Sequence, residues 1–223
     1  MYRTQIDGNA DEGGAAVRVA VLGASGATGR LLVEELVRRG HDVVVLIRTA
    51  GPADFAGAAW VVGDARDPAA LSELVAGADV VMSALGPRRG DARLHREVAP
   101  LLVAAMRAAG VRRFIGVSGA GIDAPGDRKS RRDRVISTVL QRVGGQSVED
   151  KAVELQVWAS SDLDWTLVRA PRLTNAPASG RVQHSAAESP RRTSISRADL
   201  AVFLADLTGQ ADYVQQAPLV ATR

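Results

Sequence analysis

The stretch "VAVLGASGATGR", residues 19–30, decides the fold, because an apolar run stops there at a glycine-rich turn. Its glycines have the spacing Gly-x-x-Gly-x-x-Gly, and residues 29–40 continue with helical spacing. A strand, a glycine turn and a helix are the setting of a dinucleotide-binding fingerprint, in which the backbone approaches a pyrophosphate at the helix N-terminus. A simple tight turn is the alternative. The residues predicted to bind the dinucleotide here are Gly23, Ser25, Gly26, Ala27, Thr28 and Gly29.

Apolar runs rich in Val and Ile recur along the chain and alternate with segments of helical spacing. Continuous runs of this kind are typical of strands that are covered on both faces. The sequence therefore predicts an α/β fold, a single Rossmann-type doubly wound parallel sheet with helices on both faces. The expected strands are 17–22, 42–47, 58–62, 78–85, 112–118 and 163–168, and the expected helices are 29–40, 67–77, 91–110 and 147–161, followed by a final helix and a closing strand.

The composition favours one cytoplasmic domain. With 223 residues, 46% of them hydrophobic, the chain is long enough for one well-buried core. It has no cysteine, so disulfides and thiolate metal sites are excluded and a reducing compartment is expected. No signal-peptide pattern or membrane-spanning apolar stretch is present, so we expect no membrane association. We expect residues 1–15 to form a flexible tail and 16–223 the domain.

Two basic runs, 127–134 and 190–197, do not predict a nucleic-acid interface. They are interleaved with acidic residues and lack aromatic residues, whereas nucleic-acid platforms combine basic and stacking side chains. The first run is interpreted either as solvated surface or as a flap that attracts an acidic substrate. The three histidines, His41, His95 and His184, do not have metal-ligand spacing, so no metal site is expected.

Four motifs taken together resemble a known family. They are "VLGASGATGRLLVEEL" (21–36), "GDARDPAALSELVAGADVVMSALG" (63–86), "VSGAG" (117–121) and "SSDLDWTLVRAP" (160–171). In their order and spacing the chain resembles the atypical short-chain dehydrogenases/reductases, specifically the NAD(P)H-binding NmrA-like group that includes biliverdin-IXβ and flavin reductases. The resemblance extends over about residues 17–205.

The end of the second expected strand favours NADP over NAD. NAD-binding proteins usually place an acidic residue there for the ribose 2′-hydroxyl, whereas "VVVLIRTA" offers Arg48, which can pair with a 2′-phosphate. An ordinary exposed arginine is the alternative. The resemblance further implies that Asp64 lies by the adenine and that Ala65 gives backbone contacts, although Asp64 also suits a turn. It implies nicotinamide-side contacts from Ser83, Ala84, Leu85, Gly86, Lys151 and Pro171.

The resemblance also implies the catalytic residues, with one departure from the family pattern. Ser118 ends the fifth expected strand, where the family keeps a serine, and Lys151 matches the lysine of Tyr-x-x-x-Lys. Ser147 stands where the tyrosine should be, so the usual acid is absent; Ser147 is also a candidate helix N-cap, paired with Asp150. The expected pocket segments are about 119–146 and 171–196, with Gly119, Ala120, Arg172 and Leu173 as substrate-pocket residues.

These features predict an NADPH-dependent reductase that transfers hydride to a conjugated small-molecule acceptor. A flavin, a quinone or a related aromatic natural product can delocalise the incoming charge, so it does not need a strong neighbouring acid. The alternative is a non-catalytic, NADPH-sensing NmrA-like regulator, which the missing tyrosine would favour. The sequence leaves the oligomeric state open between monomer and homodimer.

Overall fold

The computed structural model describes residues 16–49, 55, 57–86, 91–128 and 145–223. The expected tail, 1–15, and most of the basic run 127–134 lie outside these ranges. The strands are β1 (Arg18–Leu22), β2 (Asp42–Ile47), β3 (Ala59–Val62), β4 (Val80–Ser83), β5 (Arg113–Gly119), β6 (Asp164–Ala170), β7 (Arg172–Thr174), β8 (Val182–Ser185), β9 (Ser194–Ser196) and β10 (Leu219–Thr222). The helices are α1 (Ala27–Arg38), α2 (Pro68–Val75), α3 (Leu94–Ala109), α5 (Gly145–Ala159), α6 (Arg197–Asp206) and the 3-10 helix η1 (Leu207–Gly209).

The main sheet has eight strands in the order β3-β2-β1-β4-β5-β6-β10-β8. Every pair from β3 to β10 is parallel, which confirms the doubly wound α/β prediction. The expectation of a purely parallel sheet is wrong at one edge, because β8 pairs antiparallel with β10. The chain order reverses between β1 and β4, and in such sheets ligands bind beyond the carboxyl ends of the strands at this point.

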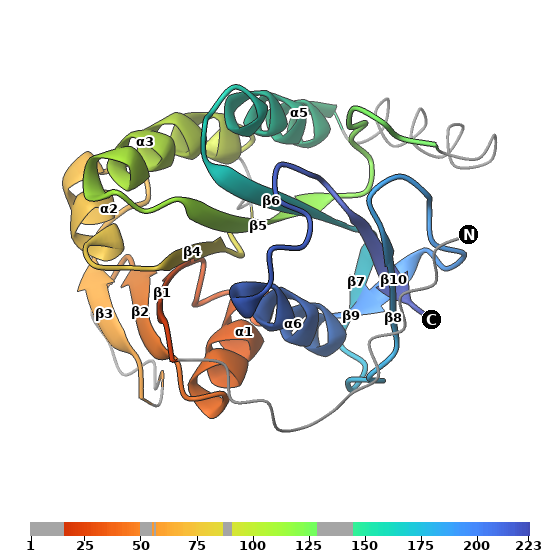
Figure 1. The fold of residues 1–223 in the computed structure, drawn as a ribbon, viewed down its shortest axis with the longest axis horizontal. Coiled ribbons are helices and arrows are strands. Elements are labelled where there is room, and N and C mark those ends of the chain that lie inside the picture. Colours follow the sequence, from red (N-terminus) through yellow and green to blue (C-terminus); the bar gives the residue numbers. More distant parts are fainter. Residues whose placement is uncertain (1–15, 50–54, 56, 87–90, 129–144) are drawn as a thin grey trace.

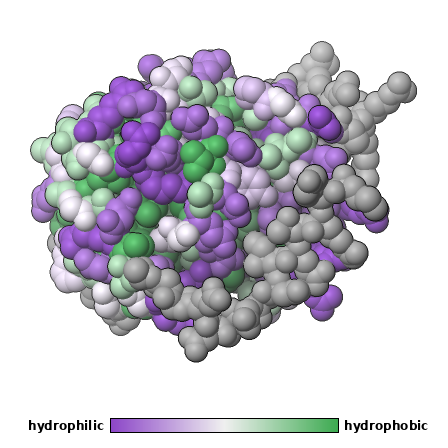
Figure 2. All heavy atoms as spheres, viewed as in Figure 1, coloured by the Kyte–Doolittle hydropathy of each residue, from purple (hydrophilic) through white to green (hydrophobic). Residues whose placement is uncertain are grey.

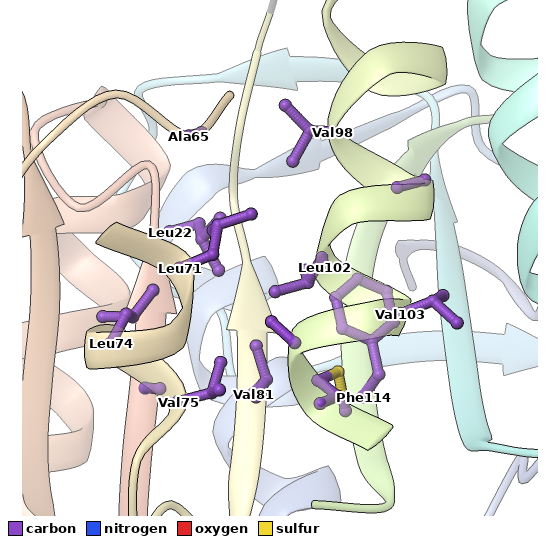
Figure 3. Close-up of a cluster of buried hydrophobic side chains, with 14 of the residues drawn as sticks. Leu22, Ala65, Leu71, Leu74, Val75, Val81, Val98, Leu102, Val103 and Phe114 are labelled. Carbon is purple, nitrogen blue, oxygen red and sulfur yellow. The ribbon is translucent and has the colours of Figure 1, made fainter. Parts of the chain in front are cut away.

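Helices cover both faces of the sheet, as expected (Figure 1). Helices α2, α3 and α5 lie on one face, and α1 and α6 pack together on the other. Figure 3 shows the first of these layers, where Leu71 and Leu74 of α2 and Leu102 of α3 converge over the sheet. Each layer is a buried apolar cluster, so the sheet is covered on both sides, which explains its continuous Val and Ile runs.

Local signals set several helix ends. The Asp67 side chain accepts the N–H of Ala69 and caps α2, which begins at Pro68. Gly110 takes a left-handed conformation with φ of 72° directly after α3, as a helix-terminating glycine does. Trp158 and Trp165, on either side of the turn from α5 to β6, are buried at 1% and 5% exposure and belong to the core.

The surface is mixed in polarity. On the face shown in Figure 2, hydrophilic residues cover much of the described surface, and hydrophobic residues lie in small patches between them. Within the described part of the chain, no helix is long and apolar enough to cross a membrane.

Candidate functional site

The glycine turn after β1 is packed too tightly for side chains at two of its three glycines. Gly23 has φ of +78°, and a Cβ there would lie 2.6 Å from the backbone of Ala84 and Leu85. A Cβ on Gly29 would lie 2.1 Å from the carbonyl oxygen of Gly23. At Gly26 the nearest atom would be 3.2 Å away. The first and third glycines therefore allow the turn, the β4 loop and α1 to approach one another closely.

The N-terminus of α1 offers donors to an anion. The first amides of a helix have no intrahelical acceptors, and at α1 no side chain caps them, since the N-cap is Gly26. The turn itself is closed by a 3.0 Å bond from the Gly26 N–H to the Gly23 oxygen. Together with the space that Gly23 and Gly29 leave, these amides fit the pyrophosphate of a dinucleotide.

The loop after β4 lies against this turn. The close approach of Gly23 to Ala84 and Leu85 places the expected nicotinamide-side residues at the reversal of strand order between β1 and β4. Within the loop, the Leu85 N–H donates to the Ser83 hydroxyl over 3.4 Å. The sequence-predicted loops 23–29 and 83–86 thus lie side by side at the carboxyl ends of β1 and β4.

The residues expected near the adenine end lie at the ends of β2 and β3. Arg48 directly follows β2 and is exposed, and within the described chain no carboxylate pairs with it. The Asp64 carboxylate accepts the Arg66 N–H over 2.8 Å, so Asp64 does form the turn that the alternative interpretation foresaw. Its side chain is also exposed, while Ala65 is buried at 7% exposure.

A cavity of about 250 Å³ lies beyond the carboxyl ends of β5 and β6. Six of its lining residues are ones that the sequence singled out for cofactor, catalysis or substrate: Leu85, Ser118, Gly119, Lys151, Pro171 and Leu173. The others are Val117, Gly121, Ile122, Ser147, Val148 and Ala170. Two expected pocket residues, Ala120 and Arg172, do not line the cavity; the Ala120 N–H donates to the Ala170 carbonyl oxygen, and Arg172 is exposed on β7.

Ser118 and Lys151 lie together at the floor of this cavity. The Ser118 hydroxyl is buried, and no hydrogen-bond partner for it is present among the described residues. The Lys151 ammonium donates to the carbonyl oxygen of Val117, the residue before Ser118, over 2.8 Å. A polar hydroxyl that is buried in a cavity wall without a partner is ready to bond a ligand.

Lys151 has two further neighbours that sequence reasoning missed. Its Nζ lies 3.1 Å from His95 Nδ1 and 3.2 Å from a carboxylate oxygen of Glu154. Glu154 stands three residues after Lys151 on the same helix, a spacing that could have signalled the pair. His95 comes from α3, and nothing in the sequence indicated that it would meet Lys151.

The environment moves the pKa values of this pair. Burial lowers the pKa of the Lys151 ammonium below its usual value, and the Glu154 carboxylate offsets part of that effect. For Glu154, burial alone would raise the pKa of the carboxyl, but Lys151 and His95 outweigh it and the pKa lies below its usual value. Each of the two groups therefore favours the charged form of the other, while burial opposes both charges.

The interpretation of Ser147 as a helix N-cap, with Asp150 completing the pattern, is wrong. Ser147 lies inside α5, which includes Gln146 before it, and it lines the cavity. Asp150 caps a different helix, because its carboxylate accepts the N–H groups of His95 and Arg96, each over 2.9 Å. Such long-range capping fixes the start of α3 against α5 and has no signature in the sequence.

A fully buried arginine supports one wall of the cavity. Arg169, at the end of β6, has no exposed surface and makes a two-pronged ion pair with Asp127, with contacts of 2.7 and 2.5 Å. It also donates to the carbonyl oxygens of Ile122 and Ala217. The loop after β5, which includes the lining residue Ile122, is thereby fixed to the sheet.

No arrangement for a metal is found in the described part of the chain, where no three His, Cys, Asp or Glu side chains come together suitably. The fit of the site is instead to a dinucleotide, on the evidence of the glycine turn and the unpaired amides of α1.

The family model for NAD(P)H-binding proteins matches residues 23–211. The chain belongs to the NAD(P)H-binding family. The match begins at the first glycine of the turn and extends past α6, so it includes the cavity and the loops around it. This match confirms the NAD(P)H-binding part of the expected family resemblance.

Individual relatives of this NAD(P)H-binding protein agree with the family. It is 41% identical over 122 residues to a 3-diazoavenalumate denitrifying reductase from a Streptomyces species, a match that covers 49% of this chain and 40% of the relative. The chain spans less than half the length of the curated relatives it matches.

Solved structures are similar over nearly their whole length. A proposed exported protein from Burkholderia pseudomallei is 30% identical, with a TM-score of 0.78 and coverage of 92% of this chain and 99% of that one. A proposed NADH-flavin reductase from Streptococcus pneumoniae has the same TM-score at 21% identity and covers 93% and 100% of the two chains, which shows a shared fold.

Proposed function

We propose that the protein is an NADPH-dependent reductase that transfers hydride to a conjugated small molecule bound in the cavity over Ser118 and Lys151. The observation that carries the proposal is the cavity itself. It joins residues expected on the nicotinamide side, Leu85 and Pro171, to a buried hydroxyl without a partner and a buried ammonium. A bound nicotinamide would supply the hydride.

The cavity walls suit a flat, largely apolar acceptor. Leu85, Ile122, Val148, Ala170 and Leu173 supply apolar surface, and Ser118 offers a single buried hydroxyl to fix the orientation of the acceptor. The chain has two tyrosines, Tyr2 and Tyr213; the side chain of Tyr213 bonds His184, and it does not line the cavity. A conjugated acceptor can spread the charge of an incoming hydride, so it is reduced without the tyrosine acid.

We further propose that NADPH is preferred to NADH. The support is Arg48, an exposed cation directly after β2 that no carboxylate neutralises within the described residues. A 2′-phosphate would pair with it, whereas the acidic residue that NAD-binding proteins use there is absent.

Two relatives bear on the class of acceptor. One is named a flavin reductase and the other a reductase of a diazo compound. Flavins and diazo compounds are both conjugated electrophiles, which supports an acceptor of this general kind without naming one.

The test is steady-state NADPH oxidation with a panel of free flavins, quinones, an aryl diazonium salt and unconjugated ketones. We expect turnover with at least one conjugated acceptor and little with the ketones. Ser118→Ala should slow the reduction of that acceptor while NADPH affinity, measured by calorimetry, is unchanged. NADPH binding without oxidation of any acceptor would contradict the proposal and favour a non-catalytic NADPH sensor.

A further inference from the structure

A cluster of three buried, ionisable side chains lies behind the cavity floor. The side chains of His95, Lys151 and Glu154 are only 3%, 12% and 6% exposed. They come from two helices, His95 from α3 and the other two from α5, and the Asp150 carboxylate holds these helices in register through the backbone of His95. Burying charged groups is costly unless they are paired, so this arrangement calls for a reason.

Three polar groups of the protein lie close to the Lys151 ammonium. It donates to the Val117 carbonyl oxygen over 2.8 Å, lies 3.1 Å from His95 Nδ1, and makes an ion pair with Glu154 Oε2 at 3.2 Å that lacks hydrogen-bond geometry. The stem of the side chain lines the cavity. These contacts therefore hold the Lys151 ammonium in one position beside Ser118 and restrict the motion of its side chain.

We propose that Glu154 and His95 are positioning residues, which hold Lys151 as a charged ammonium at the cavity floor. There it stabilises the negative charge that develops on the acceptor as hydride arrives. This inference rests on the proposed function for its catalytic consequence, but the positioning itself does not depend on any turnover. It also accounts for a site without tyrosine, since a fixed positive charge stabilises an anion without transferring a proton.

The surroundings of Lys151 single out Glu154 as the counter-ion. From α5, Asp150 also carries charge, but it is bonded to Arg96 and to the start of α3. From α3 come His95 and that same Arg96. From β5 come only the Val117 carbonyl and the Ser118 hydroxyl. Among the described residues, Glu154 is thus the carboxylate in direct ion contact with Lys151.

The chain offers an unusually direct test, because it has only two lysines, Lys129 and Lys151. Protein labelled with carbon-13 at the lysine side chains gives two titrating signals, which Lys129→Arg assigns. In the wild-type protein, Lys151 should still be protonated at about pH 7.5. In Glu154→Gln its titration midpoint should fall by at least about one pH unit, because the buried ammonium loses its counter-ion.

Glu149→Gln is the matched control. It makes the same substitution on the same helix, but Glu149 is exposed and pairs with Arg96, so the midpoint of Lys151 should not move. Glu154→Asp keeps the charge and should retain most of the wild-type midpoint. An unchanged titration midpoint of Lys151 in Glu154→Gln would overturn the proposal. A neutral Lys151 at about pH 7.5 in the wild type would also overturn it, and that measurement does not require the variant to fold.

Turnover gives an independent readout with the best acceptor of the panel. As the pH is raised, kcat should fall when Lys151 loses its proton. In Glu154→Gln this fall should occur at a lower pH than in the wild type, while the KM for NADPH changes little. His95→Phe should lower kcat several-fold, and His95→Gln, which restores an acceptor, should recover part of it. If the wild type reduces no acceptor, the proposed function fails, but the NMR titration still decides whether Glu154 holds the charge of Lys151.

Discussion

Gly29→Ala should destabilise the protein, although a glycine-to-alanine change within a helix ordinarily stabilises it. Gly29 is the third residue of α1, where alanine would be favoured by about 0.5–1 kcal/mol on helix propensity alone. The new Cβ, however, would lie 2.1 Å from the Gly23 oxygen and 2.9 Å from the Ala24 Cα. Both contacts are with backbone, so no side chain can rotate away from them.

The size of the stability loss in Gly29→Ala follows from how far α1 and the glycine turn must move apart. Real Cβ contacts essentially never fall under 3.0 Å, so α1 and the turn must move apart by about 1 Å. Overpacking of this kind costs typically 1–3 kcal/mol, and a rigid backbone contact belongs at the upper end. After the helix gain is subtracted, we expect a net loss of about 2 kcal/mol, or roughly 4–8 °C in Tm for a chain of this size.

Urea denaturation and thermal unfolding measure this loss, with Gly209→Ala as the control. A Cβ on Gly209 would meet nothing within 4 Å, so that variant should unfold within about 0.5 kcal/mol of the wild type. The displaced amides of α1 should also weaken NADPH binding at least about tenfold, or roughly 1.4 kcal/mol. If Gly29→Ala unfolded at the same denaturant concentration as Gly209→Ala, the close packing of the turn would be refuted.

Three further predictions concern single side chains. We expect the wild type to bind NADPH at least about tenfold more tightly than NADH, or by roughly 1.4 kcal/mol, and Arg48→Ala to remove most of this preference. Equal affinities of the wild type for the two cofactors, measured by calorimetry, would contradict this. Ser147→Tyr places a phenol on the cavity lining near Lys151 and should raise ketone reduction while changing quinone reduction little; efficient ketone reduction by the wild type would point to a different acid. Asp127→Asn leaves the buried Arg169 charge without its carboxylate and should cost about 3–5 kcal/mol of stability, whereas Asp162→Asn, at an exposed pair, should unfold close to wild type.

The sequence predicted the frame of the site because that frame depends on local patterns. The Val and Ile runs gave the strands, and the glycine turn fell between β1 and α1 as expected. Ser118 and Leu85 share one cavity because parallel strands bring their carboxyl ends to the same edge of a sheet, and Lys151 reaches it from α5. The roles of these residues in binding and catalysis stay predictions.

What sequence reasoning missed depends on contacts between distant segments. His95 meets Lys151 across 56 positions of the chain, and Asp150 caps α3 in place of its own helix. Helical periodicity reports which face of a helix is apolar, but it does not report which polar groups two packed helices bring together. The antiparallel strand β8 escaped for a related reason, since it lies within an irregular Pro-containing segment and is only four residues long.

The buried Arg169 has a consequence for the dynamics of the cavity wall. Its guanidinium, at the end of β6, is hydrogen-bonded to the loop after β5 and to the segment just before β10. Without these bonds the three segments would fluctuate separately. Opening the loop after β5 would remove Asp127 and leave the Arg169 guanidinium buried without its counter-ion. The free energy of opening this loop is therefore coupled to that of opening the sheet. The wall formed by Gly121 and Ile122 should therefore exchange its backbone amides more slowly than a loop that lacks such an anchor.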